Sequence, residues 1–202
     1  MHDIYYGTDR PPHRKPILMT RPDERIGEPY LRCDPSKVIA VVMTNQPDRN
    51  SVYAAPDDTS NRIAGHIIDF LQHEVKKGRL PKDLLPLQSG VGNIANAVLA
   101  GLNNGPFDNL TAYTEVLQDG MLDMLRSGTL ASASATALSL SPAAMQDFND
   151  RIDYYKQRIV LRPQEISNHP ELIRRMGLIA MNGMIEACLL YTSDAADDSL
   201  RV

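Results

Sequence analysis

A lone carboxylate stands within a run of β-forming residues in the middle of the chain. The run covers residues 110–117, Glu115 lies near its end, and Asp119-Gly120 stops it. In sheets whose strands are joined by helices, groups at the carboxyl ends of the strands face the ligand crevice. A charge at the end of a buried strand must be paired, hydrogen-bonded or functional. Glu115 is therefore the first candidate for chemistry, and a solvated glutamate on an edge strand is the alternative.

A glycine turn is the second feature that could take part in chemistry. Residues 89–93 read Ser-Gly-Val-Gly-Asn between a short apolar run and an alanine-rich helical pattern. A strand, a glycine turn and a helix N-terminus together present backbone N–H groups to an anion or a developing oxyanion. Such turns also use glycine for steric reasons alone. A dinucleotide-dependent oxidoreductase is a further alternative, but Ala95 replaces the third glycine of that fingerprint and no convincing acidic partner follows.

Strand and helix patterns alternate along the rest of the chain, which predicts an α/β fold with a largely parallel sheet and flanking helices. The apolar, β-branched run 38–43 is typical of a buried strand. Further strands are expected at 84–88, 110–117, 130–140, 159–163 and 178–187. Helices are expected from a cap at 59–61 to 76–78, and over 94–102, 121–125, 142–148 and 171–176. A polar loop, the usual place for site groups, is expected at 164–170.

Composition excludes several classes of partner. The net charge is −4 without a long basic block, which argues against a nucleic-acid surface. Cys33 and Cys188 give no disulfide framework and no zinc spacing, which fits a reducing compartment. No apolar run approaches the roughly 18 residues of a membrane span, and the start is not a signal peptide, so a cytoplasmic location is expected. His66 and His73 lack further ligands nearby, so a surface role is favoured and no metal site is predicted.

Three segments together resemble the acetyl-CoA hydrolase/transferase family. They are residues 85–99, 113–120 and 161–171, and the likeness is strongest to succinyl-CoA:acetate CoA-transferases, which are class I CoA-transferases. The resemblance implies an incomplete CoA-transferase (NagB/RpiA-like) fold with its active site between two domains. It implies that Glu115 is the catalytic carboxylate, that Asn168 is an active-site amide and that the Val91 N–H is an oxyanion donor. The implied CoA- and oxyanion-binding residues are Gln88, Ser89, Gly90, Gly92 and Asn93.

The same resemblance implies the chemistry and its partners. Coenzyme A would be a substrate, with no permanently bound cofactor, and CoA would pass between an acyl-CoA and a carboxylate such as acetate or succinate. A glutamyl-CoA thioester at Glu115 would be the intermediate. An acetyl-CoA hydrolase and an inactive truncated α/β fragment are the alternatives, and the full-length enzyme is expected to be a homodimer. Arg49 could meet a CoA phosphate, although a solvated loop arginine is favoured.

Three parts of the chain are expected. Residues 1–36 are rich in proline and charge and are read as an irregular arm that connects to a missing N-terminal domain. Residues 37–187 are read as the first part of the C-terminal α/β CoA-transferase domain. Residues 188–202 are read as a non-native tail, because residues 188–197 look like the translation of a sequencing adapter. A genuine acidic tail is the alternative.

Overall fold

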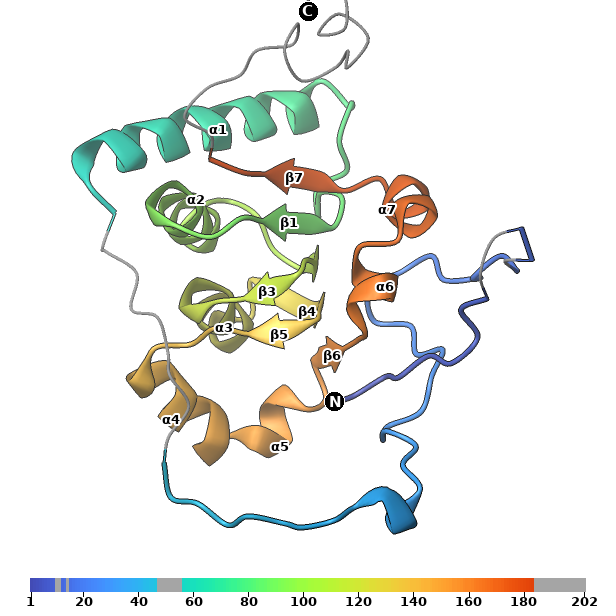
Figure 1. The fold of residues 1–202 in the computed structure, drawn as a ribbon. Coiled ribbons are helices and arrows are strands. Elements are labelled where there is room, and N and C mark those ends of the chain that lie inside the picture. Colours follow the sequence, from blue (N-terminus) through green and yellow to red (C-terminus); the bar gives the residue numbers. More distant parts are fainter. Residues whose placement is uncertain (10–11, 14, 47–55, 184–202) are drawn as a thin grey trace, which may run out of the picture.

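The computed structural model describes residues 1–9, 12–13, 15–46 and 56–183, and its centre is a parallel sheet. The five strands have the order β6-β4-β2-β1-β7, and all neighbours are parallel (Figure 1). Two short strands, β3 and β5, form a separate parallel pair. The strands are β1 Leu87–Ser89, β2 Leu110–Tyr113, β3 Val116–Leu117, β4 Leu130–Ala135, β5 Ala137–Leu138, β6 Ile159–Leu161 and β7 Ile179–Met181. The predicted α/β class with a largely parallel sheet is confirmed.

Helices lie on both sides of these strands. In Figure 1, α2 and α3 lie on the opposite side of the strands from α6 and α7, and α1 packs along α2. The helices are α1 Asp58–Lys76, α2 Asn93–Asn103, α3 Asp119–Ser127, α4 Pro142–Asp150, α5 Ile152–Tyr155, α6 Gln164–Ser167 and α7 Pro170–Met176, preceded by a 3-10 turn at Pro35–Lys37.

Local chemistry explains where these helices begin and end. The α1 helix is capped by Asp57, whose carboxylate accepts from the Ser60 N–H at 2.7 Å, so the cap lies just before the predicted 59–61. Its end at Lys76 is followed by Gly78 with a φ of +70°, as the Lys-Lys-Gly signal predicts. At α4, Ser141 caps the helix by accepting from the Ala144 N–H at 3.2 Å.

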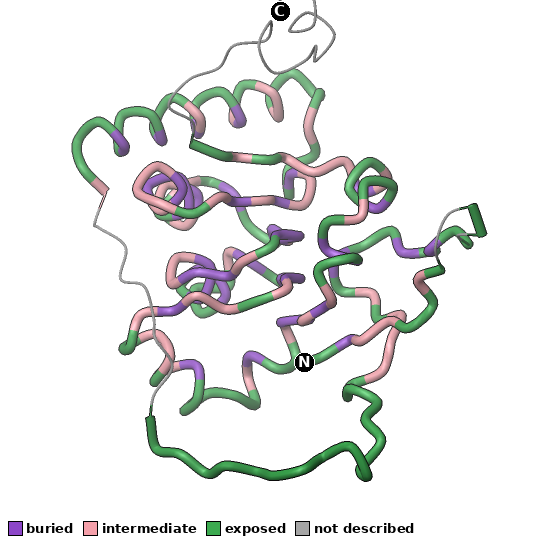
Figure 2. The backbone as a smooth tube through the Cα atoms, in the orientation of Figure 1, coloured by how far each residue is buried: buried purple, intermediate pink, exposed green. Residues whose placement is uncertain are grey.

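Two apolar clusters bury the sheet. In β2, Leu110 and Ala112 belong to the larger cluster, which includes side chains of α1, α2 and α3. Tyr113, the next residue, belongs to the smaller cluster together with Ile17 of the N-terminal arm and Ile166 of α6. Successive strand residues point to opposite faces, so β2 is covered on both. Figure 2 shows the buried residues gathered in the strands and in the helix faces turned toward them.

Two expected strands are each interrupted by a bend. The run 110–117 divides into β2 and β3 at Thr114 and Glu115, and the run 130–140 divides into β4 and β5 at Thr136. The two bends are joined, because the Glu115 carbonyl accepts from the Thr136 N–H at 2.9 Å. Beyond the bend, β3 and β5 leave the main sheet and pair with each other. The two continuous strands predicted from sequence are therefore wrong at these points.

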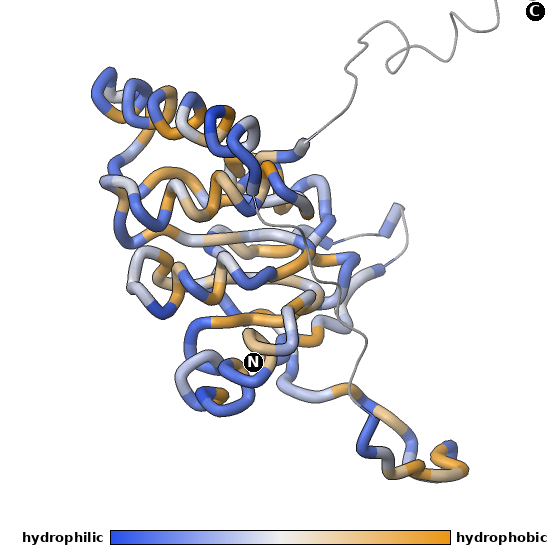
Figure 3. The backbone as a smooth tube through the Cα atoms, turned by 90° about the vertical axis from the view of Figure 1, so that its left-hand side faces the viewer, coloured by the Kyte–Doolittle hydropathy of each residue, from blue (hydrophilic) through white to orange (hydrophobic). Residues whose placement is uncertain are grey.

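The buried strand predicted over 38–43 is also wrong. This segment has no regular structure, and its side chains are exposed, with Ile39 at 99% and Met43 at 88%. Figure 2 shows the segment as exposed, and Figure 3 shows a hydrophobic stretch in the lobe that projects at the lower right. An apolar run predicts burial only where another layer is available to cover it, and no described strand pairs with this one.

Other predictions need smaller changes. Gln164–Ser167 is a helical turn, α6, rather than part of a loop, and the Pro163 carbonyl accepts its first hydrogen bond, from the Ser167 N–H at 3.1 Å. The last strand in the described part of the chain is β7, which ends at Met181, before the end of the predicted 178–187. Residues 184–187, Arg49 and the tail 188–202 lie outside the described residues.

The N-terminal arm is held to the sheet by a buried ion pair. Arg162 directly follows β6, its side chain is fully buried, and its guanidinium is bonded to the carboxylate of Asp3. The guanidinium also donates to Ser134 Oγ at 2.8 Å and to the Pro22 carbonyl at 2.9 Å. Asp3 in turn accepts from the Gly27 N–H at 2.7 Å. One arginine therefore joins two separate parts of the arm to β4 and β6 of the sheet.

We predict that Arg162→Met lowers the free energy of unfolding by about 3–5 kcal/mol, because the substitution leaves the Asp3 carboxylate buried without its partner. Chemical denaturation of the protein that carries this segment measures the change.

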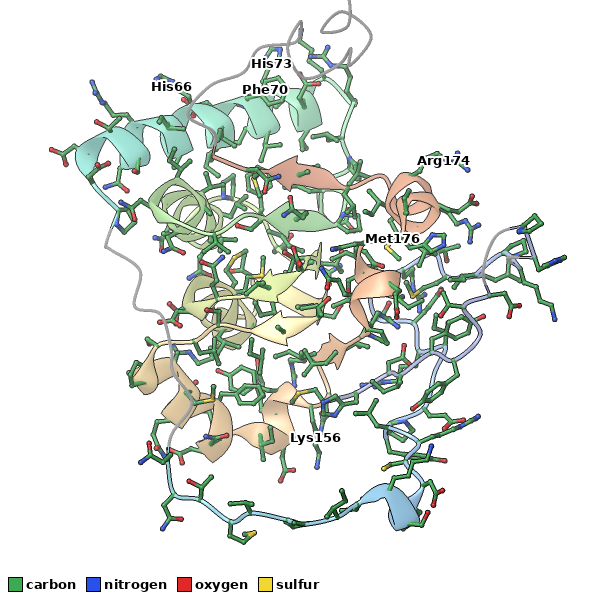
Figure 4. The ribbon with its side chains drawn as sticks, in the orientation of Figure 1. His66, Phe70, His73, Lys156, Arg174 and Met176 are labelled. Atoms are coloured by element: carbon green, nitrogen blue, oxygen red, sulfur yellow. The ribbon has the colours of Figure 1, made fainter. Side chains whose placement is uncertain are left out.

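The matched control is Arg174→Met. Arg174 lies 3.7 Å from Glu171, its side chain is 77% exposed, and it points away from α7 in Figure 4. This variant should remain within about 0.5 kcal/mol of the parent protein. An Arg162 variant no less stable than this control would contradict the anchoring role.

Candidate active site

The glycine turn lies between β1 and α2, where its backbone conformation requires glycine. Gly92 has a φ of +126° and a ψ of −175°, a region that is essentially restricted to glycine. A Cβ on Gly90 would lie 2.7 Å from Asn182 Oδ1 and 3.4 Å from the Met181 carbonyl. The Gly90 N–H donates to that same carbonyl at 2.8 Å. The turn therefore fits closely against the carboxyl end of β7.

The Val91 N–H is a free donor of this turn. Within the described ranges no acceptor is paired with it, and Val91 itself is 51% exposed. The neighbouring carbonyls, those of Ser89 and Gly90, both accept hydrogen bonds from side chains. The turn thus offers several unpaired backbone N–H groups at the start of α2, that of Val91 among them, where the helix dipole favours negative charge.

Glu115 lies at the bend between β2 and β3, and two nearby residues of its segment are bonded to this turn. The residue before it, Thr114, donates from Oγ1 to the Ser89 carbonyl at 3.1 Å, and Gln118 donates from Nε2 to the Gly90 carbonyl at 2.8 Å. Both of these side chains are buried, whereas Glu115 is exposed. The carboxylate is therefore solvated, as the alternative interpretation has it, but β2 is an inner strand of the sheet and not an edge strand.

The carboxylate of Glu115 has one side-chain partner in the described structure. Gln164, the first residue of α6, donates from Nε2 to Glu115 Oε1 at 3.0 Å. The α6 helix is held in place by Tyr113, whose hydroxyl donates to the Ile166 carbonyl. Burial raises the pKa of Tyr113 to about 12, with Arg162 opposing the shift, so this hydroxyl keeps its proton at neutral pH. Two residues near the end of β2 thus bind α6.

Asn168 ends α6, one turn beyond Gln164. Its N–H donates to the Gln164 carbonyl at 2.8 Å, and its side chain is exposed. Among the described residues no hydrogen bond joins the Asn168 amide to Glu115, so its role as an active-site amide stays a prediction. The amide that is bonded to Glu115 in the structure is that of Gln164. The sequence interpretation placed Gln164 in a loop and gave it no role. The available signal was its place directly after Pro163, which ends a strand.

The remaining predicted binding residues lie around the glycine turn. The Gln88 side chain exchanges two hydrogen bonds with that of Asn182, at 3.3 and 2.9 Å, across the β1–β7 pair. Ser89 is buried, and its hydroxyl donates to the Gly90 carbonyl at 3.1 Å. Asn93 begins α2 and lies with Val91 and Gly92 at an open hollow of about 370 Å³. The structure therefore brings together the turn, Glu115 and α6.

Other candidate ligands lie elsewhere. Figure 4 shows His66 and His73 on the outer face of α1, beside the exposed ring of Phe70. No cluster of three or more potential metal ligands occurs among the described residues. Within the same ranges, no helix has both the length and the apolar character needed to cross a bilayer.

Comparison with known proteins places this geometry in context. No family model matches the chain. The chain is 52% identical over 187 residues to an acetyl-CoA hydrolase of Schizosaccharomyces pombe. This match covers 93% of the chain and 36% of that protein. It is 46% identical over 186 residues to a succinyl-CoA:acetate CoA-transferase of Clostridium kluyveri. This match covers 92% of the chain and 34% of that protein. The predicted resemblance is confirmed. The chain spans about a third of the length of these enzymes.

Solved structures show more distant likenesses. RipA from Yersinia pestis has a TM-score of 0.47 and 24% identity, over 69% of this chain and 30% of that one. A 4-hydroxybutyrate CoA-transferase from Porphyromonas gingivalis has a TM-score of 0.48 and 20% identity, over 67% of this chain and 34% of that one. Both TM-scores are below 0.5, and the fold is defined by the sheet order of this chain.

We predict that Gly92→Ala destabilises the protein by about 1–3 kcal/mol, because a Cβ is strained at this combination of φ and ψ. Thermal or chemical unfolding of the protein that carries this segment measures the change.

Gly65→Ala is the control with the opposite sign. Gly65 lies inside α1, and a Cβ there would meet nothing within 4 Å. Alanine should stabilise the helix by about 0.5–1 kcal/mol. Equal effects of the two substitutions would show that the backbone of the turn is not strained.

Proposed function

We propose that this chain carries the nucleophile and an oxyanion donor of a CoA-transferase that moves CoA between a short-chain acyl-CoA and a carboxylate. The observation that carries the proposal is the link between Glu115 and the glycine turn. The side chains of Thr114 and Gln118, on either side of Glu115, are both bonded to that turn. A potential nucleophile and a free backbone donor are thereby held on one rigid frame.

The chemistry begins with a carboxylate oxygen of Glu115. This oxygen attacks the thioester carbonyl of the acyl-CoA, the carbon–sulfur bond breaks, and CoA leaves as a thiolate beside a mixed anhydride. The thiolate then attacks the glutamyl carbonyl, which releases the acyl group as a carboxylate and leaves a glutamyl-CoA thioester. A second carboxylate takes up the CoA by the reverse of these steps, and this restores Glu115.

Each attack in this sequence builds negative charge on a carbonyl oxygen. The Val91 N–H is suited to receive it, because a preorganised donor needs no rearrangement as the charge develops, and loss of one such donor typically costs about 10²–10³ in rate. Gln164 is suited to hold the Glu115 carboxylate, to which it already donates. Asn168, at the end of the same helix, is proposed to bind the acyl oxygen.

The substrates are proposed from the same resemblance. Coenzyme A enters as a substrate and not as a resident cofactor, and we propose that Gln88, Ser89 and Asn93 border its thioester end. The two relatives are named for acetyl-CoA, succinyl-CoA and acetate, so short acyl groups are the first to test. We also propose that the full-length protein is a homodimer. A chain that spans a third of these relatives would be inactive by itself if further segments complete the site.

Hydrolysis of acetyl-CoA is the second candidate function. The Schizosaccharomyces pombe relative is named as a hydrolase, and the difference between the two activities is whether water or a carboxylate attacks the glutamyl-CoA thioester. Water releases free CoA and restores Glu115, whereas a carboxylate takes up the CoA. The exposed position of Glu115 in the described part of the chain favours access by water.

We predict that Glu115→Gln abolishes turnover of acetyl-CoA in a full-length protein that carries this segment, because an amide cannot act as the nucleophile. Borohydride added after acetyl-CoA should reduce a thioester at Glu115, and peptide mass spectrometry detects the product.

The matched control is Glu165→Gln, which removes a carboxylate from the exposed first turn of α6. It should leave turnover unchanged. Normal turnover by the Glu115 variant would end the assignment.

The acceptor distinguishes the two candidate functions. We predict that acetyl-CoA plus succinate yields succinyl-CoA, whereas acetyl-CoA alone releases little free CoA, because a carboxylate is a better nucleophile than water toward the glutamyl-CoA thioester. Chromatography of the CoA species measures both. Rapid release of free CoA without succinate would favour the hydrolase.

A further inference from the structure

Gln118 makes an unusual contact for its position. It is the N-cap residue of α3, and in that position a polar side chain commonly accepts from a backbone N–H of the first turn. The Gln118 side chain makes no such cap. It is 1% exposed and extends to the glycine turn, where its Nε2 donates to the Gly90 carbonyl at 2.8 Å. The orientation of the amide is determined, because a carbonyl oxygen only accepts and the amide nitrogen must therefore face it.

This orientation leaves the other end of the amide unsatisfied. Gln118 Oε1 is buried and has no hydrogen-bond partner among the described residues. A buried acceptor without a partner typically costs about 1–3 kcal/mol. Methionine or leucine would fill the same space without this cost, so stability alone does not explain a glutamine here. The contact with the Gly90 carbonyl is the feature that requires an amide.

The Gly90 carbonyl and the Val91 N–H belong to the same peptide unit. A trans peptide is planar, and its C=O and N–H point in opposite directions. A side chain that holds the carbonyl therefore also sets the direction of the N–H. We propose that Gln118 is a positioning residue, which aims the Val91 N–H at the reacting carbonyl by holding the opposite end of the peptide. This inference rests on the proposed function.

The peptide needs an external restraint because of its neighbours. It joins Gly90 to Val91, so one of the two torsions that turn it belongs to a glycine, which permits backbone rotations that other residues resist. The preceding peptide is held at both ends, since the Ser89 carbonyl accepts from Thr114 and the Gly90 N–H donates to the Met181 carbonyl. Among the described residues, the Gly90–Val91 peptide is held only at its carbonyl. Ser89 Oγ also reaches that carbonyl, at 3.1 Å, but it belongs to the turn and moves with it.

The first test is Gln118→Met in a full-length protein that carries this segment. We expect kcat for acetyl-CoA cleavage to fall by about tenfold to a hundredfold. This is less than the loss of about 10²–10³ in kcat when an oxyanion donor is removed altogether, because the N–H is still present but is no longer held in one direction. KM for acetyl-CoA should stay unchanged, because the aimed N–H acts on the developing charge and not on the bound substrate. The control is Gln72→Met on α1, which changes the same side chain away from the site and should alter neither constant.

Thr114→Val tests whether the loss of activity comes from the direction of the Val91 N–H or from any loss of a hydrogen bond to the glycine turn. It removes the bond to the Ser89 carbonyl, but the peptide that this bond holds is still fixed by the Gly90 N–H. Its kcat should therefore fall less than that of Gln118→Met. An unchanged kcat in Gln118→Met, or equal changes in kcat and KM, would overturn the proposal.

Gln118→Glu keeps the shape and tests the inference if the Met variant does not fold. A protonated carboxyl can donate to the Gly90 carbonyl, whereas an ionised one faces it with a second acceptor. The ratio of its kcat to that of the parent protein should therefore fall as the pH rises, at unchanged melting temperature. A ratio that is constant with pH overturns the role of Gln118. Loss of activity in Glu115→Gln, measured in parallel, shows separately whether the proposed function holds.

Discussion

The bend at Thr114 and Glu115 is the constraint on which the site depends. At this point the chain leaves the main sheet, and the Glu115 carbonyl is held by the Thr136 N–H of the neighbouring bend. The bend turns the carboxylate out of the sheet while Thr114 stays buried and bonded to the glycine turn. A strand that continued straight would place Glu115 within the ladder, where its side chain would face a packed layer. The two short strands after the bends, β3 and β5, maintain this departure.

Sequence patterns located the parts of the site but not the contacts between them. The glycine turn, the carboxylate at a strand end and the helix after each strand follow from residue type and spacing, since glycine, proline and alternating apolar residues restrict the backbone locally. Gln118 and Gln164 were not identified because their importance comes from what they reach. Each contacts a residue that is distant in sequence, and no local pattern distinguishes a glutamine that spans two elements from one on the surface.

The segment 38–43 shows the opposite error. Its composition favours a buried strand, and the structure leaves its side chains exposed, Ile39 almost completely. Local preference describes what a segment can form, whereas burial requires a second surface at the right place. The same distinction applies to 110–117, where strand-forming residues continue through a bend. That bend is held by a hydrogen bond from the Thr136 N–H to the Glu115 carbonyl. Tertiary contacts decide both cases.

The tie between Arg162 and Asp3 also sets an order of events during synthesis. The two residues are separated by 159 positions, and ribosomes add about 5–20 residues per second, so the arm waits on the order of ten to thirty seconds for its partner to appear. During that interval the Asp3 carboxylate remains in water at no cost. The arm therefore docks late, after β1, β2, β4 and β6 have been made.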